Sequence, residues 1–162
     1  MGGSRIAIRI SSYAPDNMAI KLIECDKQKS YKLAEYMNDI IIIQGDGRNV
    51  DLLKEEGIRD MDAFIALTDS SETNILACLT AKELGVKKTI AEVENIQFIS
   101  TAERLNIGNI INKKLLAASR IFQLLLDEDS SNAKCLALSD AEVVELVAKE
   151  NSKITKAAVK DL

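Results

Sequence analysis

The sequence predicts an α/β fold with a doubly wound, mostly parallel sheet that carries helices on both faces. From Met18 onward, short β-branched runs alternate with amphipathic helical stretches, a pattern typical of parallel strands joined by crossover helices. The 162 residues, 47% hydrophobic and 28% charged, are enough for one well-buried domain with a small appendage.

The expected elements follow one another closely. Strands are predicted at residues 18–24, 39–44, 62–68, 88–93 and 109–112. Helices are predicted at residues 26–37, 49–57, 69–85, 95–107 and 113–126. Asp69 and Glu72 form a capping signal at the start of one helix, and Gly85 marks its end. Strands and helices that alternate in this way indicate a sheet covered on both faces.

The opening stretch, MGGSRIAIRISSYAPDN, fits two structures. Residues 5–10 alternate like a half-buried strand, but only about seven residues separate them from the next strand, too few for a parallel crossover. The other interpretation places Gly2 and Gly3 in a turn, with a helix from Ser4 to Ser12. Glu24 then lies 22 residues after Gly2, close to the separation between the glycine loop and the acidic residue of a dinucleotide fold. The helix interpretation explains more of the sequence.

In such a fold, backbone amides of the loop and of the helix N-terminus hold a pyrophosphate, and the acidic residue accepts hydrogen bonds from the ribose hydroxyls. The loop here has the pattern Gly2-x-Ser4-x-x-Ala7 in place of three glycines. Glu24 is the candidate ribose ligand. The alternative is an ordinary solvated carboxylate at the end of a strand.

Composition excludes several other functions. The chain has no histidine, and its three cysteines, Cys25, Cys78 and Cys135, form no Cys-x-x-Cys pair, so neither an imidazole base nor a zinc site is expected. The net charge of -4 argues against a nucleic-acid partner. Because the sequence shows neither an apolar run of membrane-spanning length nor a secretory leader, we expect a cytoplasmic protein.

The C-terminal part differs from the rest. The helix at residues 113–126 is apolar on more than one face, which indicates either a contact in a homodimer or a helix deep in the core. Residues 127–134 are small and polar, and we expect a linker there. Residues 135–162 are too few for an independent core and are predicted to be the start of a second, truncated domain, with a strand at residues 142–148 and a short final helix.

Several motifs together resemble the TrkA-type regulators of bacterial potassium uptake, also called RCK or KTN domains. The stretches that carry the resemblance are KLIECDKQKSYKLAE, IIQGDGRNVDLLKEEGI, MDAFIALTDSSETNILACLTAKELGVKKTIAEVEN and INKKLLAASRI. The resemblance covers roughly residues 2–126 and implies a Rossmann-like, NAD-binding TrkA-N domain within residues 1–126. It also implies a cytoplasmic regulatory subunit, dimeric or larger, that senses NAD or NADH, or in some relatives an adenosine nucleotide. Such a subunit gates a membrane potassium transporter and lies at the inner face of the membrane through that partner.

Seven positions match the cofactor-binding positions of this family. Gly2, Ser4 and Ala7 match the phosphate loop, and Glu24 matches the ribose ligand. Asp46 matches the turn on the adenosine side, and Thr68 and Asn74 match the loop near the nicotinamide or phosphate end. Each of the last three also has a structural interpretation: Asp46 as a turn former, Thr68 as a strand-end hydroxyl and Asn74 as a polar group inside a helix.

Members of the family begin with an apolar strand directly before the glycine loop, where this chain has only Met1. That strand lies in the middle of the sheet. We therefore expect disorder at this end, a neighbouring chain in its position, or a natural strand upstream.

Three functions compete. The first is an NAD(H)-sensing regulatory subunit without catalysis, and the second is an interaction or dimerisation module that binds no nucleotide. The third is a Rossmann oxidoreductase, which is the least favoured because it needs a substrate domain and a proton-transfer group beside the nicotinamide.

Overall fold

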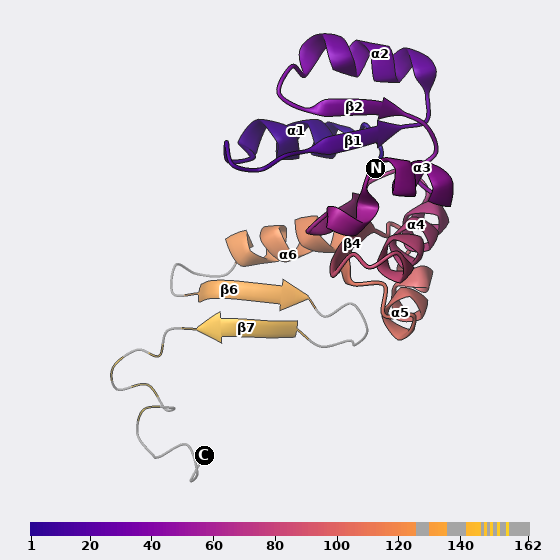
Figure 1. Cartoon of the computed structure of the whole chain (residues 1–162). Helices are drawn as coiled ribbons and strands as arrows, with labels where there is room; N and C mark the ends of the chain where they lie inside the picture. The colour runs from indigo at the N-terminus through magenta and orange to yellow at the C-terminus, as the bar shows by residue number, and fades with distance from the viewer. Residues whose placement is uncertain are drawn as a thin grey trace. The chain divides into compact units, whose positions relative to one another are not determined.

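The computed structural model describes residues 1–125, 130–135 and 142–146, together with residues 148, 150, 152 and 155 (Figure 1). It forms two compact units, Met1–Asn112 and Lys113–Leu162. The first unit contains all the predicted nucleotide-site residues.

Every strand pair in the first unit is parallel. Strand β1 (Lys21–Glu24) pairs with β2 (Ile41–Gln44), and β4 (Lys88–Glu92) lies between β3 (Ala63–Ala66) and β5 (Asn109–Ile111). Figure 1 shows β1 and β2 side by side and pointing the same way. The predicted α/β class with a parallel sheet is confirmed.

The first two residues connect the two sets of strands. The Met1 ammonium group donates to the Ile65 carbonyl at 2.7 Å, and the Met1 carbonyl accepts from the Leu67 amide at 2.9 Å. On the other side, the Gly2 amide donates to the Ile23 carbonyl at 2.8 Å. The expectation of disorder at this end is wrong, because these backbone groups hydrogen-bond to β1 and to β3 and its continuation.

Helix α1 (Arg5–Tyr13) confirms the helix interpretation of the opening stretch over the strand interpretation. Ser4 caps it, since the Ser4 hydroxyl accepts from the Ala7 amide at 3.3 Å. The helix ends before Pro15, and the short connection leads into β1. A chain that leaves the middle of a parallel sheet must cross over before the next strand, which this helix accomplishes.

The remaining segments between the strands of this unit are also helical where the sequence predicts helices. They are α2 (Lys27–Tyr36), α3 (Val50–Glu55), α4 (Ser71–Glu83) and α5 (Ile96–Arg104). The 3-10 turn η1 (Ile58–Asp60), which was not predicted, follows α3. The N-cap of α4 is Ser70 and not Asp69, because the Ser70 hydroxyl accepts from the Thr73 amide at 3.1 Å. The predicted capping signal was therefore displaced by one residue.

The core of this unit is built from small and branched side chains. Ala66 and Ala91 on the strands and Ala77 and Ala81 on α4 are fully buried, so that α4 packs closely on β3 and β4. Helix α2 packs in the same way on β1 and β2. Strand β2 has its Ile41 side chain 57% exposed, which fits a position at the edge of the sheet.

The second unit contains α6 (Lys113–Leu125) and an antiparallel pair, β6 (Ser130–Cys135) and β7 (Glu142–Leu146). Strand β7 was predicted, whereas β6 occupies most of the expected linker. Polar residues such as those of β6 predict a loop, but a ladder with β7 satisfies their backbone groups. The units divide after Asn112 and not after Leu126, because α6 packs on β6. The expected final helix and residues 126–129 lie outside the described residues.

Thr89 offers a test of the packing between β4 and β5. Its buried hydroxyl donates to the Ile107 carbonyl, so Thr89→Val removes the donor while keeping the side-chain shape. We expect the free energy of unfolding to fall by about 1–3 kcal/mol, because the carbonyl stays buried without a partner.

Thr80→Val is the matched control, since the Thr80 hydroxyl donates to the Leu76 carbonyl on the solvent side of α4. It should change the free energy of unfolding by less than about 0.5 kcal/mol. Urea denaturation measures both variants, and equal losses would contradict the assigned role of Thr89.

Candidate functional site

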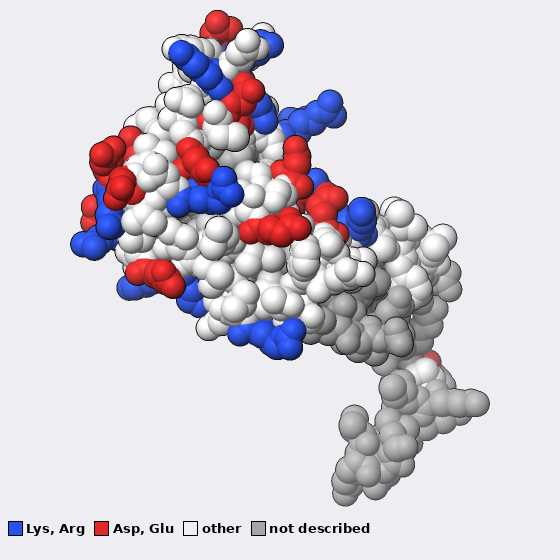
Figure 2. All heavy atoms as spheres, turned by 90° about the vertical axis from the view of Figure 1, so that its right-hand side faces the viewer, with Lys and Arg blue, Asp and Glu red and all other residues white. Residues whose placement is uncertain are grey.

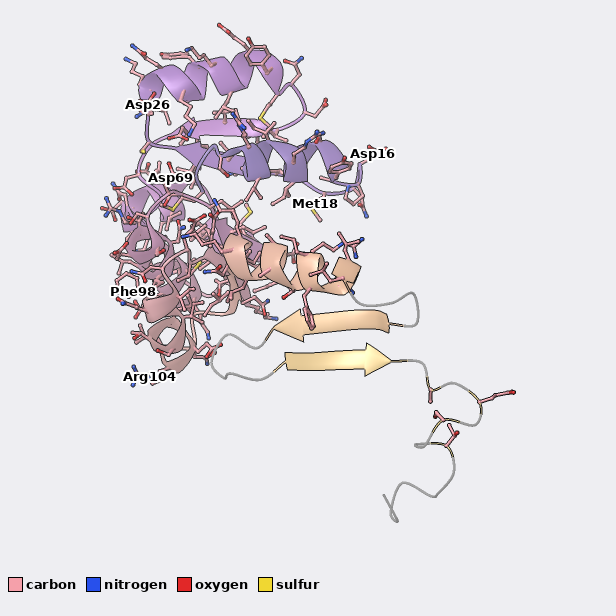
Figure 3. The ribbon with its side chains drawn as sticks, turned by 180° about the vertical axis from the view of Figure 1, so that it is seen from behind. Asp16, Met18, Asp26, Asp69, Phe98 and Arg104 are labelled. Atoms are coloured by element: carbon pink, nitrogen blue, oxygen red, sulfur yellow. The ribbon has the colours of Figure 1, made fainter. Side chains whose placement is uncertain are left out.

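The candidate site lies at the carboxyl ends of the strands, where Met1 and Gly2 lie between β1 and β3. Parallel α/β sheets bind ligands at such a topological switch point. Figure 3 shows Asp26 and Asp69, which follow β1 and β3, on the same side of the first unit. Asp16 and Met18, which precede β1, lie on the opposite side.

Gly2 and Gly3 bring the backbone close to the strand ends. Gly2 has a φ of +88°, a backbone conformation that residues other than glycine rarely adopt. A Cβ at this position would lie 2.9 Å from the Leu67 carbonyl. A Cβ on Gly3 would lie 2.4 Å from the Leu33 side chain and 2.8 Å from Oε2 of Glu24. Only a turn without side chains can approach Glu24 this closely.

The start of α1 presents backbone donors beside this turn. The Ser4 hydroxyl satisfies the Ala7 amide, while the amides of Arg5 and Ile6 have no acceptor within the described part of the chain. Helix N-termini with free amides attract anions, because the amide dipoles add up there. This end of α1 can therefore receive a phosphate group.

The Glu24 carboxylate is the centre of the site and is only 4% exposed. Its Oε2 atom accepts from the Gly3 amide at 2.8 Å and lies 3.1 Å from the Lys29 ammonium. Its Oε1 atom accepts from the Asp26 amide at 3.0 Å and from the Cys25 thiol at 3.5 Å. The carboxylate thus connects β1, the glycine turn and the first turn of α2.

These contacts keep Glu24 ionised. Burial alone would raise the pKa of its carboxyl group, but the hydrogen bonds from the Asp26 and Gly3 amides and the Lys29 ammonium lower this pKa to about 2. Glu24 therefore carries a full negative charge at neutral pH, which makes it a strong hydrogen-bond acceptor.

Asp46 lies in the turn after β2, next to the same edge of the sheet. Both of its carboxylate oxygens bind Arg48, with 2.7 Å between Oδ2 and the Arg48 guanidinium nitrogen, and the Arg48 amide donates to Oδ1. The Arg48 side chain lowers the pKa of this carboxyl group. Asp46 is about half exposed and connects to Glu24 through the backbone, since the Gly45 amide donates to the Glu24 carbonyl.

Thr68 and Asn74 form a second cluster on the other side of the glycine turn. The Asn74 Oδ1 atom accepts from the amide and the hydroxyl of Thr68, and its Nδ2 atom donates to the carbonyls of Thr68 and Glu92. The Asn74 side chain is fully buried and uses its whole hydrogen-bonding capacity on these two residues. It holds the loop after β3 against the end of β4.

The structure brings six of the seven predicted site residues around one turn. Ser4 and Ala7 begin α1, and Glu24 contacts Gly3 directly. The Thr68 methyl group lies 3.0 Å from the Cβ position of Gly2, with Asn74 behind it. Asp46 is the exception, because its carboxylate binds Arg48 within the turn after β2.

Sequence reasoning missed Lys29 and Arg48, which bind two of the predicted carboxylates. The sequence predicted ligand contacts for Glu24 and Asp46 but no partners for them within the chain. The signal for Lys29 was available, because a lysine in the first turn of a helix that follows a strand can reach back to the end of that strand.

The face that bears the strand ends carries charges of both signs. Figure 2 shows this face with acidic and basic side chains interspersed. Within the described residues, no group of three or more histidine, cysteine or acidic side chains could hold a metal ion. None of the helices among these residues is long and apolar enough to cross a membrane.

A cavity of about 570 Å³ lies elsewhere in this unit, along α1 and the connection to β1. Its lining is mainly apolar and includes Ile6, Ile10, Tyr13 and Met18. Met18 marks its position in Figure 3, on the side opposite Asp26. The cavity begins at Arg5 and Ile6, at the start of α1, and extends from there away from Glu24.

Parallel strands, a glycine turn at the switch point and an acidic residue at the end of the next strand define a Rossmann-like domain. Residues 1–113 match the family model described as the TrkA-N domain. The chain therefore belongs to the TrkA-N family.

Known proteins of similar sequence and structure agree with this family. The chain is 32% identical over 139 residues to the Trk system potassium uptake protein TrkA homolog 1 of Methanosarcina mazei, covering 86% of the chain and 34% of that relative. The GsuK RCK domain superimposes with a TM-score of 0.66 at 15% identity, over 75% of this chain and 27% of that chain. The NAD(P)-binding domain of an exopolyphosphatase-related protein from Archaeoglobus fulgidus superimposes with a TM-score of 0.61 at 9% identity, over 74% of this chain and 86% of that chain. The chain thus spans about a third of the length of the curated relatives it matches.

The low pKa of Glu24 makes stability depend on pH in the acid range. The folded carboxylate stays charged down to a pH of about 2, whereas the unfolded one binds a proton near pH 4.5. Its contribution is therefore present above pH 4.5 and is lost as the pH falls toward 2. A shift of this size corresponds to about 3 kcal/mol.

Glu24→Gln should accordingly be less stable than the parent at neutral pH, with a difference that shrinks by about 3 kcal/mol between pH 5 and pH 2. Denaturation curves across this range measure the effect. The matched control is Glu35→Gln on the exposed side of α2. A difference between parent and Glu24→Gln that does not vary with pH would contradict the ionised, hydrogen-bonded carboxylate.

Proposed function

We propose that this domain is an NAD(H)-sensing regulatory unit of a potassium uptake system. The observation that carries the proposal is the buried, ionised Glu24 carboxylate, held beside the Gly2–Gly3 turn and the free amides of α1. This arrangement offers an acceptor for a ribose diol and donors for a pyrophosphate in adjacent positions.

In this proposal each residue of the site has its own role. The amides of Arg5 and Ile6 bind the pyrophosphate, the Gly2–Gly3 turn leaves space for it because it carries no side chains, and Glu24 binds the adenosine ribose. Ser4 and Ala7 act indirectly, by fixing the start of α1: the Ser4 hydroxyl caps the helix and accepts from the Ala7 amide. The signal that the domain senses would be whether the site is occupied and whether the bound cofactor is NAD or NADH.

Asp46 and Thr68 complete the proposed site on either side. Asp46 lies at the adenosine side in the turn after β2, and Thr68 lies toward the nicotinamide or phosphate end. Asn74 contributes by positioning Thr68, since all four of its hydrogen bonds remain within the chain. We infer that the site binds its ligand without transforming it.

The assignment to potassium uptake is supported by the TrkA relatives, which are named as potassium uptake proteins. In this proposal the domain lies in the cytoplasm and transmits the ligand state to a membrane potassium transporter subunit. The solved NAD(P)-binding domain of similar fold supports the dinucleotide as the ligand. An adenosine nucleotide, which shares the ribose and the phosphates, would use the same contacts.

Titration of the protein with NADH in a calorimeter tests the proposed site. We expect Glu24→Ala to weaken NADH binding by about 1–3 kcal/mol, because the ribose hydroxyls lose a charged acceptor. Glu35→Ala, which removes an exposed carboxylate from α2, should bind like the parent. The 2′-phosphorylated cofactor should bind the parent more weakly than NADH, since its dianionic phosphate would face Glu24.

Equal NADH affinity of folded Glu24→Ala and the parent would reject the ribose role. A parent that binds no nucleotide would favour the interaction module instead. Turnover of added hydroxy acids or aldehydes with NAD would show that the domain is an oxidoreductase.

We further propose that the protein self-associates through α6. Four large apolar side chains of this helix, Leu116, Ile121, Leu124 and Leu125, are between 59% and 77% exposed. At 100° per residue they cover about half of the helix circumference, which is a wide apolar face to leave in water.

Ile121→Glu combined with Leu124→Glu should therefore lower the sedimentation coefficient of the protein toward that of a monomer. Arg120→Glu changes an exposed polar position of the same helix and is the control. Unchanged sedimentation of the folded double variant would show that α6 is not the contact.

A further inference from the structure

The solvent side of the Glu24 carboxylate is covered by one movable group, the Lys29 ammonium. The other three donors are the backbone amides of Gly3 and Asp26 and the thiol of Cys25, which contacts Oε1 at 3.5 Å. Lys29 reaches the carboxylate with a flexible side chain that is about 50% exposed. Of the two donors to Oε2, it is therefore the one that can leave without a change in the backbone.

The backbone of Lys29 is held in place independently of this contact. Its amide donates to Oδ1 of Asp26 at 2.7 Å, which is the N-cap bond of α2. From there the side chain extends over the glycine turn, so that its Cε atom lies 3.4 Å from the Cβ position of Gly3. Lys29 thus lies across the same turn that the proposed function assigns to the pyrophosphate and the ribose.

The hydrogen-bonding capacity of Glu24 leaves no room for additional donors. Oε2 accepts from the Gly3 amide and from Lys29, and Oε1 accepts from the Asp26 amide and from Cys25. A carboxylate oxygen has two lone pairs, so both oxygens are saturated. A ribose hydroxyl can bind only if one donor leaves.

We propose that the Lys29 ammonium and a ribose hydroxyl of a bound nucleotide compete for Oε2 of Glu24, so that Lys29 sets the selectivity of the site for a ribose that carries its hydroxyls. This inference rests on the proposed nucleotide site. Binding exchanges an ion pair between Lys29 and Glu24 for hydroxyl-to-carboxylate hydrogen bonds, and the ammonium group moves into solvent. Lys29 then lowers the affinity for any ligand that must reach Glu24.

The test compares ADP with 2′,3′-dideoxy-ADP by calorimetry, because the two probes share the base and the phosphates and differ in the diol. The quantity measured is the ratio of their dissociation constants, in which any general attraction of Lys29 for phosphate cancels. Lys29→Met should raise the preference for ADP about three- to fivefold, the value of a half-exposed ion pair. Lys32→Met, which removes a neighbouring exposed ammonium group from the same helix, should leave the ratio unchanged.

Lys29→Gln provides a second variant that keeps the helix and removes the charge, and it should shift the ratio in the same direction. An unchanged ratio in both Lys29 variants, or an equal change in Lys32→Met, would overturn the competition while leaving the nucleotide site standing. If the parent bound neither ADP nor NADH, the proposed function itself would fail, and this inference with it.

Discussion

The hydrogen bond between the Gly3 amide and the Glu24 carboxylate is the contact on which the rest of the site depends. It joins the turn before α1 to the end of β1, and it requires a residue without a side chain at Gly3, because a Cβ would approach Oε2 to 2.8 Å. Since the carboxylate is buried, its charge must be compensated within the chain. The Asp26 amide and Lys29 supply that compensation, so the bond also determines how α2 begins.

A second constraint acts on the other side of the turn, where polar side chains hold the loops after β3 and β4. Asn74 joins Thr68 to the Glu92 carbonyl, and the Ser71 hydroxyl accepts from the amides of Glu94 and Asn95. These bonds fix irregular backbone that the parallel ladder no longer satisfies. Buried polar residues of α4 thereby shape the edge at which a ligand would bind, although they belong to the scaffold.

The carboxylates of the candidate site are occupied within the chain, and this changes how its chemistry is understood. Glu24 pairs with Lys29 and Asp46 pairs with Arg48. Under the proposed function, a ligand that reaches either carboxylate would have to replace one of these partners, so the internal ion pairs would change as the site fills.

Local signals in the sequence were enough to predict the α/β class, the helix at the opening stretch and the position of Glu24 at the end of a strand. Each depends on short-range physics: hydrophobic period, capping by residues such as Ser4, and the length needed for a crossover. The donors that hold Glu24, the position of Met1 between two strands and the strand β6 were decided by the tertiary structure. These features depend on which backbone groups remain unpaired once the strands have assembled, and on where a long side chain such as Lys29 finds a buried charge, which neighbouring residues alone do not determine.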